Sequence, residues 1–140
     1  MSESKLEANK QLARRWFEEV WNQRSESAID AMFSPTGKAH GFPDADSVLS
    51  GPEAFKAIHR NFCGAFPDLQ ITIHDVVAEG DKVAIRWSAA MTHTGDHLGL
   101  PATGKKATLS GSSFVIVQGS QIIDGWNQMD IQHLFQQLQS

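Results

Sequence analysis

The sequence predicts a single α+β domain in which three helices precede a series of antiparallel strands. Up to Phe66, apolar residues recur three and four positions apart, as they do on one face of a helix. Beyond that point apolar and polar residues alternate with the period of two that is typical of strands. Helices and strands that are segregated along a chain indicate an α+β fold, and 140 residues are enough for one domain, residues 1–140.

The first two helices are expected at residues 6–21 and 27–33. In the first, a stripe of apolar residues that includes Trp16 lies opposite a charged face. The turn-forming residues 34–37 (Ser-Pro-Thr-Gly) are expected to end the second helix. Residues 38–42 form a weak strand candidate, and residues 43–50 are expected to be a polar loop.

The third helix is expected from a cap at Ser50 to about Phe66. Ser50 can cap the first turn while Glu53, three residues later, reaches back to it, and Pro67 stops the helix. The helix carries one apolar stripe, formed by Phe55, Ile58, His59, Phe62 and Phe66.

Four strands and a short closing helix are expected after the third helix. Gly80-Asp81 and Gly119-Ser120 provide tight turns, and residues 94–103 form a loop containing Gly and Pro. Asp130 is expected to cap the closing helix at 130–138. The strands are predicted at residues 69–79, 83–93, 107–118 and 121–129. In the second of them, one face carries Val83, Ile85, Trp87, Ala89, Met91 and His93.

A curved antiparallel sheet with helices on one face can enclose a conical apolar cavity. Its other face must also be covered, and a homodimer formed through the sheet is one route. The chain has four Trp and eight Phe but no Tyr. Ordinary core packing and a pocket lined by Trp and Phe are both compatible with this composition.

Composition argues against several classes of partner. The formal net charge is −4, and the only paired basic residues are Arg14-Arg15 and Lys105-Lys106, so no nucleic acid partner is expected. No apolar run has the length of a membrane span, and the polar first ten residues do not resemble a secretory signal. With Cys63 as the single cysteine, we expect a cytoplasmic protein.

Three stretches of the sequence resemble the SnoaL-like polyketide cyclases and their ester-cyclase relatives. They are residues 50–55 (SGPEAF) with 66–68 (FPD), residues 94–105 (TGDHLGLPATGK) and residues 123–130 (IDGWNQMD). The middle stretch is the most specific. The resemblance implies the nuclear-transport-factor-2-like fold, a cone in which three N-terminal helices pack on a curved antiparallel sheet around an apolar pocket. It also supports the homodimer through the sheet.

The resemblance further implies a reaction. These cyclases close the last ring of an aromatic polyketide by an intramolecular aldol condensation, without a metal or a cofactor. An aspartate on the last strand acts as acid and base in the founding members, and its position corresponds to Asn127 here. An amide cannot take up a proton near pH 7, but it can donate a hydrogen bond to an enolate oxygen. A histidine that assists in those cyclases has no counterpart in residues 111–115 (GSSFV).

His59 and Asn127 are the candidate catalytic residues. His59 lies on the apolar stripe of the third helix, where it is either a buried core histidine or the proton acceptor of the pocket. Alternation places Asn127 on the same strand face as Ile123 and Met129, and leaves open which face lines the pocket. The candidate residues that bind a small hydrophobic substrate are Trp16, His40, Phe55, Phe62, Trp87, His93, Phe114, Trp126 and Met129.

Some of these residues also have a structural interpretation. His93 is expected at the rim in solvent or, as a functional residue, at the pocket mouth, and His40 either lines the cavity or is an exposed edge residue. His93, Asp96 and His97 invite a metal hypothesis, but their spacing falls in a loop that contains Gly95, so no metal is expected. The chain is thus predicted to be a cofactor-free cyclase-type enzyme. The alternatives are a non-catalytic carrier of a hydrophobic ligand and a dimeric structural domain.

Overall fold

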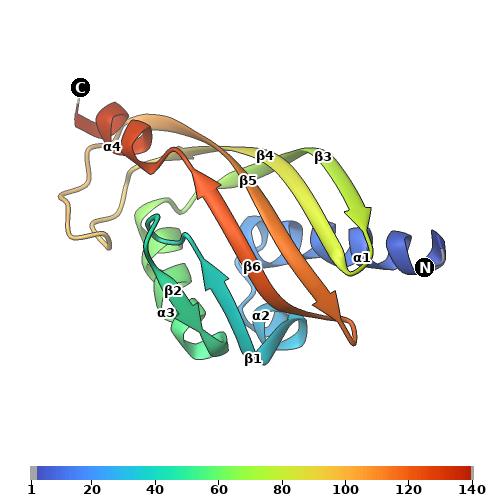
Figure 1. The fold of residues 1–140 in the computed structure, drawn as a ribbon. Coiled ribbons are helices and arrows are strands. Elements are labelled where there is room, and N and C mark those ends of the chain that lie inside the picture. Colours follow the sequence, from blue (N-terminus) through green and yellow to red (C-terminus); the bar gives the residue numbers. More distant parts are fainter. Residues whose placement is uncertain (1–2, 140) are drawn as a thin grey trace.

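A computed structural model describes residues 3–139, in which helices cover one face of a six-stranded sheet (Figure 1). The helical elements are α1 (Glu3–Arg15), η1 (Trp16–Asn22), α2 (Glu26–Met32), α3 (Gly51–Ala65) and α4 (Ile131–Gln139). The strands are β1 (Phe33–His40), β2 (Val48–Ser50), β3 (Gln70–Glu79), β4 (Lys82–Thr92), β5 (Lys106–Gln118) and β6 (Gln121–Met129). The predicted α+β class, with three helical regions before the long strands, is confirmed.

The sheet has the strand order β2-β1-β6-β5-β4-β3. Strands β3 to β6 form the predicted antiparallel meander, with the turns at Gly80-Asp81 and Gly119-Ser120. The sheet is not wholly antiparallel, however, because β1 pairs in parallel with β6. This parallel pair brings the C-terminal ends of β1 and β6 to the same edge of the molecule, which matters for the site described below.

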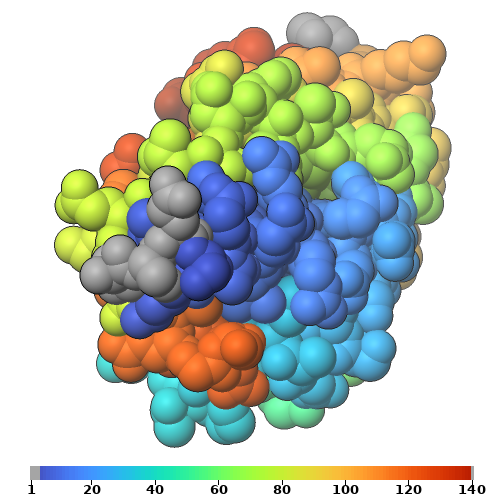
Figure 2. Space-filling view, turned by 90° about the vertical axis from the view of Figure 1, so that its right-hand side faces the viewer, coloured from blue at the N-terminus to red at the C-terminus, as the bar shows by residue number. Residues whose placement is uncertain are grey.

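The predicted first helix is continuous in sequence but changes its winding after Arg15. From Trp16 to Asn22 it is π-helical, and the wider turn lets four of its residues point into the core: Trp16, Phe17, Val20 and Trp21. At its other end, Lys5 pairs with Asp81 at 2.9 Å, which ties α1 to the turn between β3 and β4. Figure 2 shows α1 (blue) between the strands of that turn (yellow-green) and the β5–β6 turn (orange).

The predicted turn at residues 34–37 lies inside β1, and Phe33 begins this strand instead of ending α2. The turn residues form an irregularity in the strand, because Phe33 pairs with Ile122 while Lys38 pairs with Asp124. Residues 34–37 thus lie opposite a single residue of β6. This irregularity is a bulge in β1, and a bulge can accommodate a proline. The polar loop predicted at 43–50 also ends in a short strand, β2, which pairs with β1.

The start of α3 was predicted correctly, but its capping was not. Ser50 holds the cap position without a side-chain hydrogen bond to the helix. Glu53 does not reach back to it and instead accepts a hydrogen bond from Lys56 at 3.3 Å. Lys56, which is largely buried, also donates to Asp30 at 2.7 Å. Glu53 of α3 and Asp30 of α2 therefore pair with the same largely buried ammonium group.

The predicted inward face of β4 is confirmed. All five strand residues on this face are buried, namely Val83, Ile85, Trp87, Ala89 and Met91. His93, just beyond the strand, is buried as well. Asp130 caps α4 as predicted, since its carboxylate accepts a hydrogen bond from the backbone N–H of His133 at 3.1 Å. No helix within residues 3–139 combines the length and the apolar character that a membrane span needs.

The loop between β4 and β5 is anchored on the end of α3. The backbone N–H groups of Thr94 and Gly95 both donate to the carbonyl of Ala65 at 3.2 Å. The ring of His97 lies where Gly64 has no side chain, since a Cβ there would be 2.5 Å from the ring. The second stretch of the family resemblance therefore packs against the third helix.

Candidate functional site

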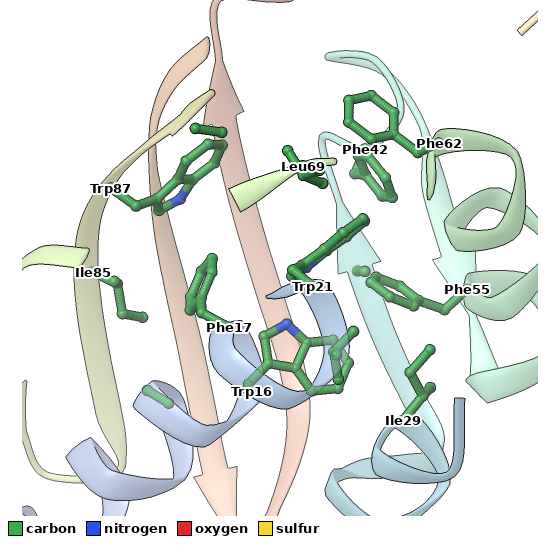
Figure 3. Packing of buried hydrophobic residues seen from close by; sticks show 14 of the residues in the cluster. Trp16, Phe17, Trp21, Ile29, Phe42, Phe55, Phe62, Leu69, Ile85 and Trp87 are labelled. Atoms are coloured by element: carbon green, nitrogen blue, oxygen red, sulfur yellow. The ribbon is translucent and has the colours of Figure 1, made fainter. Parts of the chain in front are cut away.

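The helices and the concave face of the sheet enclose a cavity of about 70 Å³. Figure 3 shows the aromatic side chains that converge on this region from η1, α3 and β4, together with Phe42 from the segment after β1. Its wall is mostly apolar, and the polar residues in it besides three tryptophans are Lys38, Ser113 and Asn127. Six of the residues named from the sequence line it: Trp16, Phe55, Phe62, Trp87, Asn127 and Met129.

The aromatic wall is held by edge-on ring contacts. Trp16 meets Phe55 with ring centroids 5.2 Å apart, and Trp21 meets Phe42 at 5.5 Å and Phe62 at 6.0 Å. Such pairs stabilise a protein by about 0.5–1.5 kcal/mol each beyond the area that they bury. Trp21 also lines the cavity, although it was not among the pocket residues predicted from the sequence. The π-helical turn is what brings both Trp16 and Trp21 to the cavity.

One end of the cavity is polar because three side chains form a hydrogen-bonded chain there. The indole Nε1–H of Trp87 donates to Ser113 Oγ at 3.1 Å, and Ser113 Oγ donates to Asn127 Oδ1 at 2.7 Å. Asn127 Nδ2 in turn donates to the backbone carbonyl of His40 at 3.1 Å. Asn127 thus presents its amide to the cavity in a fixed position.

The structure settles which face of β6 points inward. Ile122, Gly125, Asn127 and Met129 line the cavity. Simple alternation correctly grouped Asn127 with Met129, but its grouping of Asn127 with Ile123 and not with Ile122 was wrong. The pairing of β5 with β6 is irregular at this point, so that Ile123 is an extra residue and the alternation changes phase.

His59 is buried, and it is not among the residues that line the cavity. Its Nε2–H donates to the backbone carbonyl of Val20 at 2.6 Å, and its ring lies 4.8 Å from that of Trp21. Burial lowers the pKa of this imidazole. The structure therefore does not bring His59 and Asn127 together at one cavity, and the geometry matches a core histidine.

His93 is fully buried, so the expectation of a rim residue in solvent was wrong. Its Nδ1 accepts a hydrogen bond from the backbone N–H of Thr103 at 3.3 Å, and its ring lies 5.5 Å from that of Phe66. It is not a lining residue of the cavity. We conclude that His93 holds the end of the β4–β5 loop against the core.

Phe114 and Trp126 do not line the inner cavity, and their prediction as residues of that pocket was wrong. They are paired across β5 and β6, and they are 46% and 40% exposed. They precede the inward-facing Val115 and Asn127 by one residue each, so they point to the outer face of the sheet. His40 stacks on Trp126 with ring centroids 5.2 Å apart, and its Nε2 contacts Asp124 at 2.8 Å.

A second hollow, an open groove of about 510 Å³, lies at the C-terminal ends of β1 and β6. It is bordered by the segment after β1, which includes Asp44, and by the start of α4 at Ile131. His40 and Trp126 line this groove and not the inner cavity. Asn127 and Met129 line both spaces, so they form the wall between the groove and the cavity.

The inner cavity has little capacity for proton transfer or metal binding. Lys38, an exposed residue, is the one ionisable member of its lining within residues 3–139. The part of the chain that the structure describes holds no group of three His, Cys, Asp or Glu residues placed to bind a metal ion. Cys63 lies outside the lining, and burial raises the pKa of its thiol to about 11.

Sequence reasoning missed Ser113 and Gly111. Both lie on the inward face of β5, where a hydroxyl and a glycine interrupt an otherwise apolar series. A Cβ at Gly111 would lie 2.5 Å from Cζ2 of Trp87, so the glycine makes room for that indole. The interruption of the apolar alternation was a signal that could have identified both residues.

Comparisons with known proteins agree with this geometry. A protein of Jannaschia sp. CCS1 that is assigned as a SnoaL-like polyketide cyclase superposes with a TM-score of 0.89 at 18% identity, over 100% of this chain and 97% of that one. A protein of Acidithiobacillus ferrooxidans, likewise assigned as a polyketide cyclase, has a TM-score of 0.79 at 28% identity, over 99% and 98% of the two chains. IdmH of Streptomyces antibioticus, a third such assignment, has a TM-score of 0.81 at 22% identity, over 94% and 99%.

No functionally curated protein sequence matches the chain. The family model of the SnoaL-like polyketide cyclases matches residues 11–138, which include every cavity-lining residue and all three stretches that carry the resemblance. The chain therefore belongs to the SnoaL-like polyketide cyclase family.

Proposed function

We propose that this chain binds a small hydrophobic carbonyl compound in its inner cavity and promotes ring closure or isomerisation without a cofactor. The observation that carries the proposal is the amide of Asn127, held at the polar end of a mostly apolar cavity. Its N–H can donate to an oxygen on which negative charge develops, and the apolar wall strengthens that interaction by keeping water away. Family membership supports a substrate of the polyketide type.

The proposed reaction balances without a cofactor. A carbon between two carbonyl groups loses a proton and becomes the carbon of an enolate. That carbon forms a bond with another carbonyl carbon of the same molecule, and the resulting alkoxide takes up a proton to become a hydroxyl group. The proton removed in the first step is replaced in the last, so the product is an isomer of the substrate. The cavity contributes the folded substrate conformation and the hydrogen bond from Asn127 to the enolate oxygen.

The size of the cavity sets a condition on the substrate. A volume of about 70 Å³ is well below the roughly 300–1,000 Å³ of typical ligand pockets. The adjoining groove of about 510 Å³ offers the remaining space, and the wall between the two contains Met129, a flexible side chain. We propose that a bound substrate extends from the cavity into the groove once Met129 changes its rotamer.

A second candidate function is the non-catalytic binding or transport of the same kind of ligand. It is favoured by the absence of His, Asp, Glu and Cys from the cavity lining within residues 3–139. Lys38 is then the one ionisable side chain of the lining within residues 3–139, and the proton of the first step goes to its amine, to water or to a base on the substrate itself. A carrier would need only the apolar wall and the amide of Asn127.

The two candidates are separated by one substrate, nonane-2,4,8-trione, which can close to a six-membered ring by the proposed reaction. For an enzyme, the protein is expected to accelerate closure, followed by chromatography, and Asn127→Ala is expected to remove about 10²–10³-fold of that acceleration. Gln121→Ala, on the same strand and outside both the inner cavity and the groove, is the matched control. Binding without acceleration would favour the carrier, and a lack of binding would count against both.

We also propose that a second copy of the chain covers the outer face of the sheet. Phe114 and Trp126 form a cross-strand aromatic pair on that face, and both are more exposed than aromatic residues usually are. A two-fold dimer would bring this pair against the same pair of the partner, which buries both at once.

A further inference from the structure

We infer that Trp87 and Ser113 are positioning residues that fix the amide of Asn127, so that a ligand meets its N–H and not its carbonyl oxygen. The cavity then selects a hydrogen-bond acceptor, such as a ketone or ester carbonyl, over a hydrogen-bond donor. The inference rests on the proposed function, because it requires that a ligand occupies this cavity.

The orientation of the amide is fixed at its oxygen by the chain that begins at Trp87. An indole Nε1–H can only donate, and it donates to Ser113 Oγ at 3.1 Å. The hydroxyl group of Ser113 has a single hydrogen, which it donates to Asn127 Oδ1 at 2.7 Å. Trp87 and Ser113 are both buried, so water does not compete for these bonds.

The orientation is fixed at the nitrogen by the backbone of β1. The carbonyl oxygen of His40 lies 3.1 Å from Asn127 Nδ2, and a carbonyl oxygen can only accept. A rotation of the amide by half a turn would place two acceptor oxygens against each other. The close approach of the two backbones depends on Gly41, where a Cβ would clash with the backbone carbonyl oxygen of Asn127.

The polar groups of the cavity lining that are left without a partner in the protein are mainly hydrogen-bond donors. Asn127 Nδ2 carries two hydrogens, and within residues 3–139 it has one acceptor, the carbonyl of His40. The indole N–H groups of two other lining residues, Trp16 and Trp21, likewise have no acceptor in the described part of the chain. The lining has no carboxylate, so a donor on the ligand would find only weak or already shared acceptors. The ligand class that fits is a neutral, apolar molecule with carbonyl oxygens.

The same surroundings predict that the carboxyl group of an Asn127→Asp variant keeps its proton to a higher pH than a free aspartate does. An ionised carboxylate at this position would set an anionic oxygen at about the 3.1 Å that now separates Nδ2 from the carbonyl of His40. Only the protonated acid can donate there, so the pKa of the introduced carboxyl group should be raised. A carboxyl group whose pKa is raised by folding stabilises the fold at pH values below its unfolded-state pKa. This contribution is lost as the pH rises toward the folded-state pKa. The N127D protein should therefore become less stable relative to wild type as pH rises above about 4, the unfolded-state pKa of aspartate, as measured by thermal unfolding.

The selectivity is tested by NMR titration of the ¹⁵N-labelled protein with 1-indanone and with indane. The two probes share a bicyclic carbon frame, and only the ketone has an acceptor. We expect 1-indanone to shift the side-chain Nδ2 resonances of Asn127 and to bind about three- to tenfold more tightly than indane. Ser113→Ala and Trp87→Phe should reduce that ratio, whereas Ser112→Ala, on the outer face of the same strand, should leave it unchanged.

Each outcome separates the inference from the function on which it rests. If neither probe binds, the proposed cavity function fails and the inference fails with it. If both bind with equal affinity, the cavity function stands and the selectivity for an acceptor is overturned. If the ratio persists in S113A and W87F, the amide is selective without these residues, and their positioning role is overturned.

Discussion

The buried imidazole of His59 makes the stability of the protein depend on pH in a defined window. Its Nε2–H donates to the carbonyl of Val20 at 2.6 Å, while Nδ1 is buried without a partner among the described residues. Burial lowers its pKa from the ordinary 6.5, so the unfolded chain binds a proton that the folded chain does not. The contribution of the neutral imidazole to stability is fully present above pH 6.5. The free energy of unfolding should decrease as pH drops below that value, by at most about 1.4 kcal/mol per pH unit for one proton.

The measurement is urea unfolding of wild type and His59→Gln at several values between pH 5 and 7.5. Glutamine does not titrate and can still donate to the carbonyl of Val20, so the difference between the two slopes isolates the imidazole. The carboxylates of Glu26 and Asp68 do not interfere, because hydrogen bonds from Arg60 and Thr92 lower their pKa values and their effect lies at more acidic pH. Equal slopes in the two proteins would show that His59 is not a buried neutral histidine.

Three further predictions address other parts of the molecule. Gly111→Ala should destabilise the fold by about 1–3 kcal/mol in urea unfolding, because its Cβ would lie 2.5 Å from the indole of Trp87, and a change below about 0.5 kcal/mol would contradict this packing. Cys63, with a pKa of about 11, should react with a thiol reagent at pH 8 at least roughly tenfold more slowly than free cysteine, and an equal rate would refute its burial. Phe114→Ser and Trp126→Ser should weaken the proposed dimer in sedimentation velocity, and a wild-type protein that is monomeric at 100 μM, about the highest concentration of such a run, would remove that proposal.

The sequence was sufficient for features that repeat along one element. The apolar face of β4 followed from a strict period of two, because a strand that packs against helices must bury every second side chain. The helix boundaries near Ser50 and Ala65 followed from the chemistry of Gly, Pro and the cap position. Among the site residues, Phe55 and Phe62 were predicted because a helical stripe that faces a sheet also faces whatever space the sheet encloses.

The features that were missed depend on contacts between strands. The irregularity at Ile123 changes the phase of β6, and no local signal in residues 121–129 marks it. The parallel pairing of β1 with β6 joins segments that are far apart in sequence, and it alone places the carbonyl of His40 at Asn127. The role of His59 could not be read from its stripe, since a helical stripe shows that a side chain is buried and not which group it meets.

The presence of an amide side chain at Asn127 can be understood from these inter-strand contacts. A side chain at this position lies between the donor hydroxyl of Ser113 and the acceptor carbonyl of His40, so it must accept on one side and donate on the other. A neutral amide does both at every pH, whereas a carboxyl group does both only while protonated. The position therefore suits chemistry in which charge develops on the substrate and the protein contributes a dipole instead of a proton acceptor. On this reasoning, the rate of any ring closure in the cavity should follow the ionisation of the substrate and not that of a protein side chain.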